Sequence, residues 1–179
     1  MSCKDARGGS YDRRIKLHLR ILEAPVVSTE DMVRAMQRAY SSAGILIEIV
    51  SSMNLDLPEF MDLSAGGCEP NYPTEAQLAL FTDNREGIDP GEMVVCFVRS
   101  TIPPYNGCAV HPPQMPGAVV AKYATKWTLA HEVGHVLGLK HVEEEDRLMI
   151  PCTKYIKTDP PLVLEEIQQM QQSGLAPEC

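Results

Sequence analysis

Residues 131–141 read His-Glu-Val-Gly-His-Val-Leu-Gly-Leu-Lys-His, a stretch that holds three of the chain's five histidines. On a helix, residues four positions apart lie on one face, so His131 and His135 can direct their imidazole nitrogens at one point. Glu132 follows the first histidine, which places its carboxylate beside that point and not on it. The stretch therefore predicts a helix that carries a metal site with a base next to it.

Gly138 is the second part of the signal. A helix that continued beyond it would carry His141 past the metal, whereas a glycine in the left-handed conformation ends the helix and turns the chain back. Three neutral imidazoles, those of His131, His135 and His141, leave a fourth tetrahedral position for water, as in catalytic zinc sites. We therefore predict one catalytic Zn²⁺, with Glu132 as the general base for a zinc-activated water.

Two less specific interpretations compete with this one. An amphipathic helix can carry histidines by accident, but five specified residues in a fixed register rarely arise that way. A protein that binds zinc and peptides without turnover is the other alternative. Glu132 favours activity, because a base in that position has no use in a purely structural site.

The same residues carry a family resemblance. The stretch 131–141 resembles the long zinc signature of the metzincin clan of metallopeptidases, and residues 146–151, Asp-Arg-Leu-Met-Ile-Pro, are similar to the clan's Met-turn. Met149 lies eight residues after His141, a spacing most similar to that of the matrixin branch. The resemblance implies a zinc-dependent endopeptidase that hydrolyses peptide bonds in proteins, with Met149 and Pro151 supporting the metal site from below.

The chain also departs from the matrixin pattern. Val142 stands where matrixins have Ser or Thr, and Thr153 stands where they have Tyr, so the specificity of the substrate pocket is not carried over. Residues 110–122 contain one histidine, His111, and no aspartate. The structural zinc and calcium sites of matrixins are therefore not expected, and we predict one zinc ion and no obligatory calcium.

Hydrophobic patterning predicts the α/β (α+β) class, and the resemblance implies a mixed twisted sheet with an edge strand, an active-site helix, a Met-turn and a C-terminal helix. Apolar residues alternate with polar ones over residues 15–21, which predicts a strand with one wet face and an exposed His18. Ser28 is expected to cap a helix at 30–42, and Thr125 the zinc helix. Further strands are expected at 45–50, 93–98 and 118–122, a long loop at 51–73, and helices at 74–83 and from about 160 to 172.

Residues 118–122 follow a Pro-rich stretch and suit the edge strand on which clan members bind substrate as an added strand. The expected partner is therefore an extended protein or peptide. Residues 1–14 are expected to be an N-terminal tail, disordered by default. Residues 15–179 are expected to form a single catalytic domain, which the cleft divides into an upper subdomain of about 15–137 and a lower one of about 138–179.

Composition narrows the class of protein. With 179 residues, 44% of them hydrophobic and 22% charged, the chain suits one globular domain. A net charge of −8 argues against a nucleic-acid partner, and no stretch is apolar enough for a membrane span. A monomer is expected. The acidic residues 143–146 either favour basic side chains in a substrate or form a solvated loop.

Six cysteines suggest disulfides, and of the possible pairs Cys96–Cys108 is the first to test. The polar residues 1–10 do not resemble a signal peptide. A trimmed exported form, another export route and a cytoplasmic protein with free thiols all stay open, although the family resemblance favours secretion. Cys3 could hold zinc in a latent form, but its surroundings lack the prosegment motif of matrixins. A highly selective toxin, effector or processing peptidase is a further alternative within the enzymes.

Overall fold

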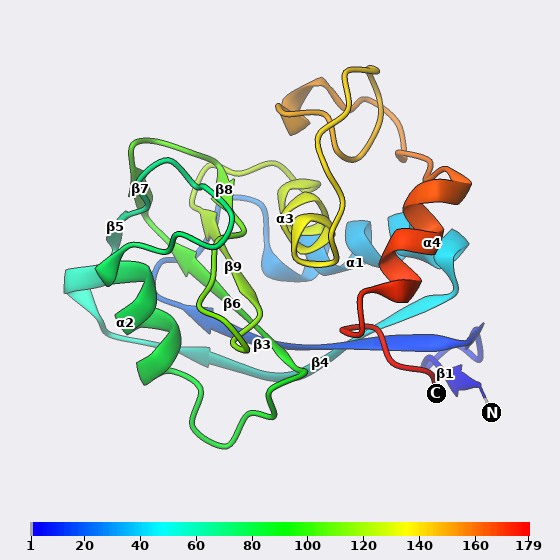
Figure 1. The fold of residues 1–179 in the computed structure, drawn as a ribbon, viewed down its shortest axis with the longest axis horizontal. Helices are drawn as coiled ribbons and strands as arrows, with labels where there is room; N and C mark the ends of the chain where they lie inside the picture. The colour runs from blue at the N-terminus through cyan, green and yellow to red at the C-terminus, as the bar shows by residue number, and fades with distance from the viewer. Residues whose placement is uncertain (1) are drawn as a thin grey trace.

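The computed structural model describes residues 2–179. Its central sheet has five strands in the order β4-β3-β6-β9-β8; the first four are parallel, and β8 pairs antiparallel with β9. Figure 1 shows α1, α3 and α4 on one side of this sheet and α2 on the other. The central strands are β3 (Arg13–Ile21), β4 (Ile45–Asn54), β6 (Met93–Val98), β8 (Gly107–Cys108) and β9 (Gly117–Ala121), and the helices are α1 (Thr29–Tyr40), α2 (Glu75–Asp83), α3 (Thr128–Val136) and α4 (Leu164–Gln172).

Two small sheets and three 3-10 turns complete the secondary structure of residues 2–179. An antiparallel hairpin lies near the N-terminus, and a short parallel pair lies beside α2 in Figure 1. Within these residues, no helix combines the length and the apolar character that a membrane span requires. The remaining elements are β1 (Cys3–Lys4), β2 (Ser10–Tyr11), β5 (Asp62–Ser64), β7 (Ser100–Ile102), η1 (Ser41–Ala43), η2 (Pro58–Phe60) and η3 (Thr153–Tyr155).

Strand β6 shows why the sheet is covered on both faces. All six of its residues are buried: Val95 and Phe97 belong to the core shared with α1 and α3, whereas Val94 and Val98 belong to the core that includes Phe81 of α2. The prediction of a strand at 93–98 is confirmed. Helices on both sides are the usual cover for parallel strands of this kind.

The helix ends were predicted with mixed success. Ser28 accepts a hydrogen bond from the backbone N–H of Asp31 and caps α1, as predicted. The zinc helix α3, in contrast, begins at Thr128 and has no side-chain cap, so the prediction that Thr125 caps it is wrong. The Thr125 hydroxyl lies instead 2.7 Å from that of Thr153, because the chain makes an extra turn before the helix begins.

The edge of the sheet is also corrected. Residues 118–122 were expected to be the edge strand, but β9 lies between β6 and β8, and β8 is the edge. The chain before β9 turns back so that Gly107 and Cys108 pair with Val120 and Val119. A strand of two residues has no periodicity, so hydrophobic patterning could not predict it.

His18 is not the exposed residue that the alternation predicted. It is 5% exposed, with Nδ1 2.8 Å from Ser51 Oγ and Nε2 2.7 Å from a carboxylate oxygen of Glu92. Lys16 donates to the other oxygen of Glu92 at 2.8 Å. Neighbouring polar groups thus cover the face of β3 that was expected to be wet, and strand periodicity alone cannot reveal such a cover.

The disulfides differ from the expected pair. Cys68 is bonded to Cys108, whereas Cys96 is a buried free thiol on the α2 side of the sheet. Burial raises the pKa of the Cys96 thiol to about 12. The pair Cys96–Cys108 is therefore wrong, because the alternation of β6 directs Cys96 into the core.

The N-terminal segment is ordered where a disordered tail was expected. Cys3 lies in β1 and forms a disulfide with Cys179, and Figure 1 shows the two chain ends side by side. The segment also pairs with the C-terminus through Asp12, whose carbonyl accepts from the backbone N–H of Cys179. A cysteine in a disulfide has no thiolate to offer, so the idea that Cys3 holds zinc in a latent form is also wrong.

Candidate metal centre

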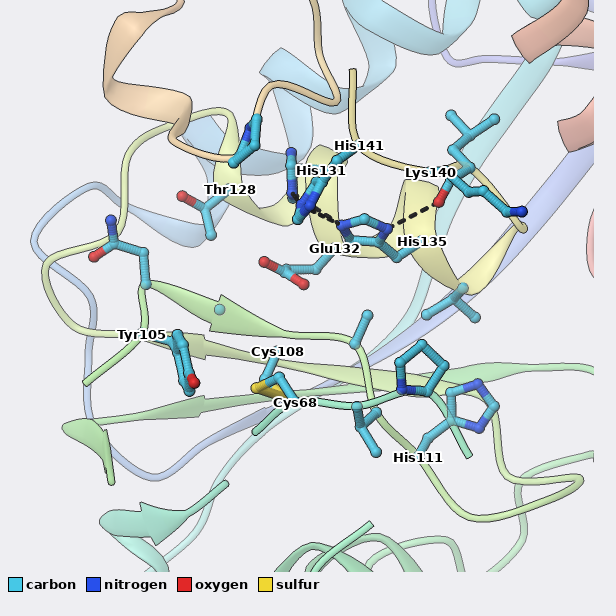
Figure 2. A pocket seen from close by; sticks show the side chains of 18 of the residues that line it. Cys68, Tyr105, Cys108, His111, Thr128, His131, Glu132, His135, Lys140 and His141 are labelled. Carbon is cyan, nitrogen blue, oxygen red and sulfur yellow. Dashed lines mark hydrogen bonds between the residues drawn. A yellow bond between two sulfur atoms is a disulfide. The ribbon is translucent and has the colours of Figure 1, made fainter. Parts of the chain in front are cut away.

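The three histidines of residues 131–141 converge on one point (Figure 2). The Nε2 atom of His135 lies 3.1 Å from those of His131 and His141, and the latter two atoms lie 3.3 Å apart. Zinc bound tetrahedrally at about 2.0–2.1 Å requires nitrogens about 3.3 Å apart. The spacing of the three nitrogens therefore fits one zinc ion.

Backbone carbonyls fix the tautomer of two of these imidazoles. Nδ1 of His131 lies 2.8 Å from the carbonyl oxygen of Leu148, and Nδ1 of His135 lies 2.9 Å from that of Leu139. A carbonyl only accepts, so Nδ1 carries the proton and Nε2 keeps a free lone pair. Burial lowers the pKa of His131 to about 4 and also lowers those of His135 and His141. All three groups are thus neutral at neutral pH, the form that binds metal.

Gly138 turns the chain as its residue type suggested. Its φ is +94°, in the left-handed region, and its backbone N–H donates to the carbonyl of His135 at 2.9 Å. The backbone N–H of Leu139 donates to the carbonyl of Gly134, also at 2.9 Å. These bonds close the end of α3, so the following residues return and bring His141 to the other two ligands.

Met149 lies beneath the helix. It is fully buried, and a Cβ added to Gly134 would meet its sulfur at 2.8 Å. The carbonyl of Met149 accepts from the N–H of Val142, which follows the third histidine. Sequence reasoning did not name Gly134 as a site residue, although a glycine inside the zinc helix was a signal of close packing there. The missing side chain of Gly134 allows the helix to pack directly against Met149.

Glu132 points into the cleft and is 7% exposed (Figure 2). Burial raises its pKa to about 8. On the opposite side lies Gly107 of β8, where an added Cβ would meet the Glu132 carboxylate oxygen Oε1 at 2.5 Å and its Cδ at 2.7 Å. Gly107 is a site residue that sequence reasoning missed, since its closeness to Glu132 depends on the antiparallel return of β8.

The cleft around these groups has a volume of about 810 Å³. His111 lines it but lies outside the histidine cluster, with Nδ1 2.9 Å from the carbonyl of Pro112. Tyr155 is 53% exposed and is not among the lining residues. Two walls face each other across the cleft: the helix wall, residues 128–153, and the strand wall, residues 67–71 and 105–111.

A family comparison agrees with this geometry. The model of the matrixin family matches residues 71–172, more than half of the chain. This chain belongs to the matrixin family. The chain is thereby a member of the metzincin clan of zinc metallopeptidases, and its three histidines form a group that can bind a metal ion.

Individual relatives are more distant. The matrixin is 24% identical over 131 residues to proteins named extracellular metalloprotease from Arthroderma benhamiae and Trichophyton verrucosum. The alignments cover 68% of this chain and 47% of those proteins, so the chain spans about half the length of these relatives. The fold is similar to that of metalloproteinase-II from Bacteroides fragilis, with a TM-score of 0.64 and 18% identity over 91% of this chain and 54% of that one.

Proposed function

We propose that this protein is a zinc-dependent endopeptidase in which His131, His135 and His141 hold one zinc ion and Glu132 transfers the proton. The observation that carries the proposal is the convergence of three neutral imidazoles beside a buried carboxylate in an open cleft. A closed structural zinc site would need a fourth protein ligand, whereas the candidate group found among residues 2–179 consists of these three histidines, beside an open cleft.

The chemistry divides between the ion and the chain. When bound, zinc lowers the pKa of water to about 7 and offsets negative charge that develops on a carbonyl oxygen. Glu132 accepts the proton of the attacking water and delivers it to the leaving amine nitrogen. Without a metal ion, burial raises the pKa of Glu132 to about 8; a cation bound beside the carboxylate would lower that pKa, so that the group can accept a proton near neutral pH. The carbonyls of Leu148 and Leu139 hold the imidazoles of His131 and His135 in orientation.

The proposed substrate is an extended segment of a protein or peptide. Strand β8 pairs on one side with β9 and is the last strand of its sheet, so its other side can accept an added strand. Gly107 of this strand lies directly across from the Glu132 carboxylate, and this closeness supports a peptide bound along β8 next to the reacting groups. The edge that receives substrate is therefore Gly107–Cys108 and not residues 118–122 as first expected.

The setting of the enzyme is part of the proposal. The two disulfides, and the likeness to the extracellular metalloproteases of Arthroderma benhamiae and Trichophyton verrucosum, support a location outside the cytoplasm. A net charge of −8 supports a protein substrate over a nucleic acid, and we propose a monomer with no membrane contact.

Cleavage of a fluorescence-quenched peptide library and of casein by metal-analysed protein tests the proposal. We expect internal cuts by wild-type protein that holds about one zinc per chain. The chelated protein should not cut, and the Glu132→Gln variant should cut at least about 10²-fold more slowly than wild type. Zinc binding without any cutting would favour a peptide-binding protein without turnover. If the protein released only single residues from the ends of the peptides, it would be an exopeptidase and not an endopeptidase.

A further inference from the structure

A buried ion pair joins the Met-turn to the C-terminal helix. Nη2 of Arg147 lies 2.9 Å from Oε1 of Glu166 in α4, and the two side chains are only 15% and 10% exposed. The contact is close but poorly aligned for a hydrogen bond, and Nε of Arg147 is buried with no hydrogen-bond partner among residues 2–179. The second oxygen of Glu166 accepts from the N–H of Val163 and closes the first turn of α4.

Stability alone is a weak reason for this pair. Removal of two charges from water costs free energy that their attraction repays only in excellent geometry, and well-packed apolar side chains often serve as well or better. Arg147 leaves a buried N–H unpaired, so its geometry is not of that quality. The pair is better explained by the position that it imposes on the neighbouring backbone.

That backbone contacts two of the three ligand segments. The carbonyl of Leu148, the residue after Arg147, accepts a hydrogen bond from Nδ1–H of His131 at 2.8 Å. Met149, one residue further on, accepts from the N–H of Val142, which directly follows His141. A shift of the Met-turn would therefore rotate one imidazole and displace the segment that carries another.

Helix α4 makes a second contact with the ligand segments. A Cβ added to Gly138 would meet the side-chain nitrogen of Gln169 at 2.7 Å, so this glutamine lies directly against the turn that leads to His141. Glu166 and Gln169 are three residues apart and therefore share one face of the helix. In Figure 1, α4 lies beside α3 on the same side of the sheet, with the chain that follows α3 above it.

We propose that Glu166 is a positioning residue for the metal centre: through Arg147 it sets the Leu148 carbonyl, which orients the imidazole of His131. The C-terminal helix thereby acts on the affinity for zinc and not only on the stability of the fold. This inference rests on the proposed zinc site, but it does not require that the protein cuts peptides.

The test compares Glu166→Gln with Glu92→Gln. Glu92 forms a similarly covered ion pair with Lys16, at 2.8 Å, with side-chain exposures of 13% and 32%, and it does not line the cleft. Zinc affinity is measured on the metal-free proteins by competition with a chromophoric chelator, the ligand geometry by the absorption spectrum of the cobalt(II) protein, and Tm by thermal unfolding.

We expect both variants to lower Tm but only Glu166→Gln to weaken zinc binding, by about tenfold or more, and to shift the cobalt bands. The double variant R147M/E166M removes the charges while it keeps apolar packing, so it guards against simple unfolding. It should fold and still bind zinc at least several-fold more weakly than wild type.

Four outcomes separate the claims. Wild-type zinc affinity and cobalt spectra in both Glu166→Gln and R147M/E166M would overturn the positioning role. Equal loss of zinc affinity in Glu92→Gln would overturn it too, because the effect would then follow stability alone. Wild-type protein that binds no zinc would overturn the metal site and this inference with it, whereas zinc binding without peptide cleavage would overturn only the proposed peptidase.

Discussion

The two walls of the cleft are built in different ways. The helix wall takes its three ligands, its carboxylate and its methionine from one continuous stretch, residues 131–149. The strand wall brings together segments from distant parts of the chain, since Cys68 is bonded to Cys108 and Gly107 pairs with Val120. The chemistry is thus encoded locally, whereas the space around Glu132 depends on long-range pairing.

The largest effect is expected at the point where the helix wall faces the strand wall. Glu132→Gln keeps the shape of the side chain but cannot accept a proton, so kcat/KM should fall by about 10²–10⁴-fold. Zinc content should stay at about one per chain, because the carboxylate is not among the three converging ligands. Steady-state kinetics and metal analysis on the same sample check both parts. A fall of less than tenfold would mean that another group transfers the proton.

The next effect comes from the strand wall alone. In Gly107→Ala the added Cβ would overlap the Glu132 carboxylate at 2.5–2.7 Å, so that side chain must move. A displacement of about 1 Å at a catalytic group costs on the order of 10²-fold in rate, and we expect a loss of that size in kcat with zinc affinity unchanged. Gly91→Ala is the matched control, since its added Cβ meets nothing within 4 Å. Equal activity of the two variants would show that the Glu132 side chain can make space for the added methyl group and keep its catalytic position.

The difference between the walls also explains what the sequence could predict. The zinc helix, the turn at Gly138 and the Met-turn were found because their signals are a fixed spacing and a glycine in a required conformation. A helix was also predicted at 74–83, and the structure has α2 there, with a capping box between Thr74 and Gln77 that is a local signal of the same kind. These features depend on residues a few positions apart, which local periodicity and capping rules can detect.

The errors share the opposite property. Strand β8 has two residues, so it carries no pattern, and the edge of the sheet was assigned to the next strand instead. The pairing of Cys108 with Cys68, and that of Cys3 with Cys179, join positions 40 and 176 residues apart, which no local rule connects. His18 was placed in water because alternation reports which face is polar and not what covers it.

A smaller effect is expected from the covalent tie of the strand wall. The double variant C68S/C108S frees the loop and β8, and should lower the free energy of unfolding by roughly 2–4 kcal/mol. Because Cys108 adjoins Gly107, we also expect kcat/KM to fall several-fold at temperatures well below Tm. C3S/C179S should lose stability with no change in kcat/KM, because that disulfide joins the chain ends and does not line the cleft. If the two double variants lose activity equally, the Cys68–Cys108 bond acts on the cleft only through stability.

The smallest effect is expected at Met149, which packs beneath the zinc helix in the helix wall. Met149 is fully buried and lies against Gly134, so Met149→Leu keeps the volume but replaces a flexible thioether with a branched side chain. We expect a loss of about 1 kcal/mol, or roughly 2–4 °C in Tm, with kcat within about threefold of wild type. Met36→Leu, in α1 and fully buried in the same core, should cost a similar amount and leave zinc affinity unchanged. Unchanged stability of Met149→Leu would count against its role as a packed floor, and a large loss of kcat at unchanged Tm would give the sulfur a direct part in the chemistry.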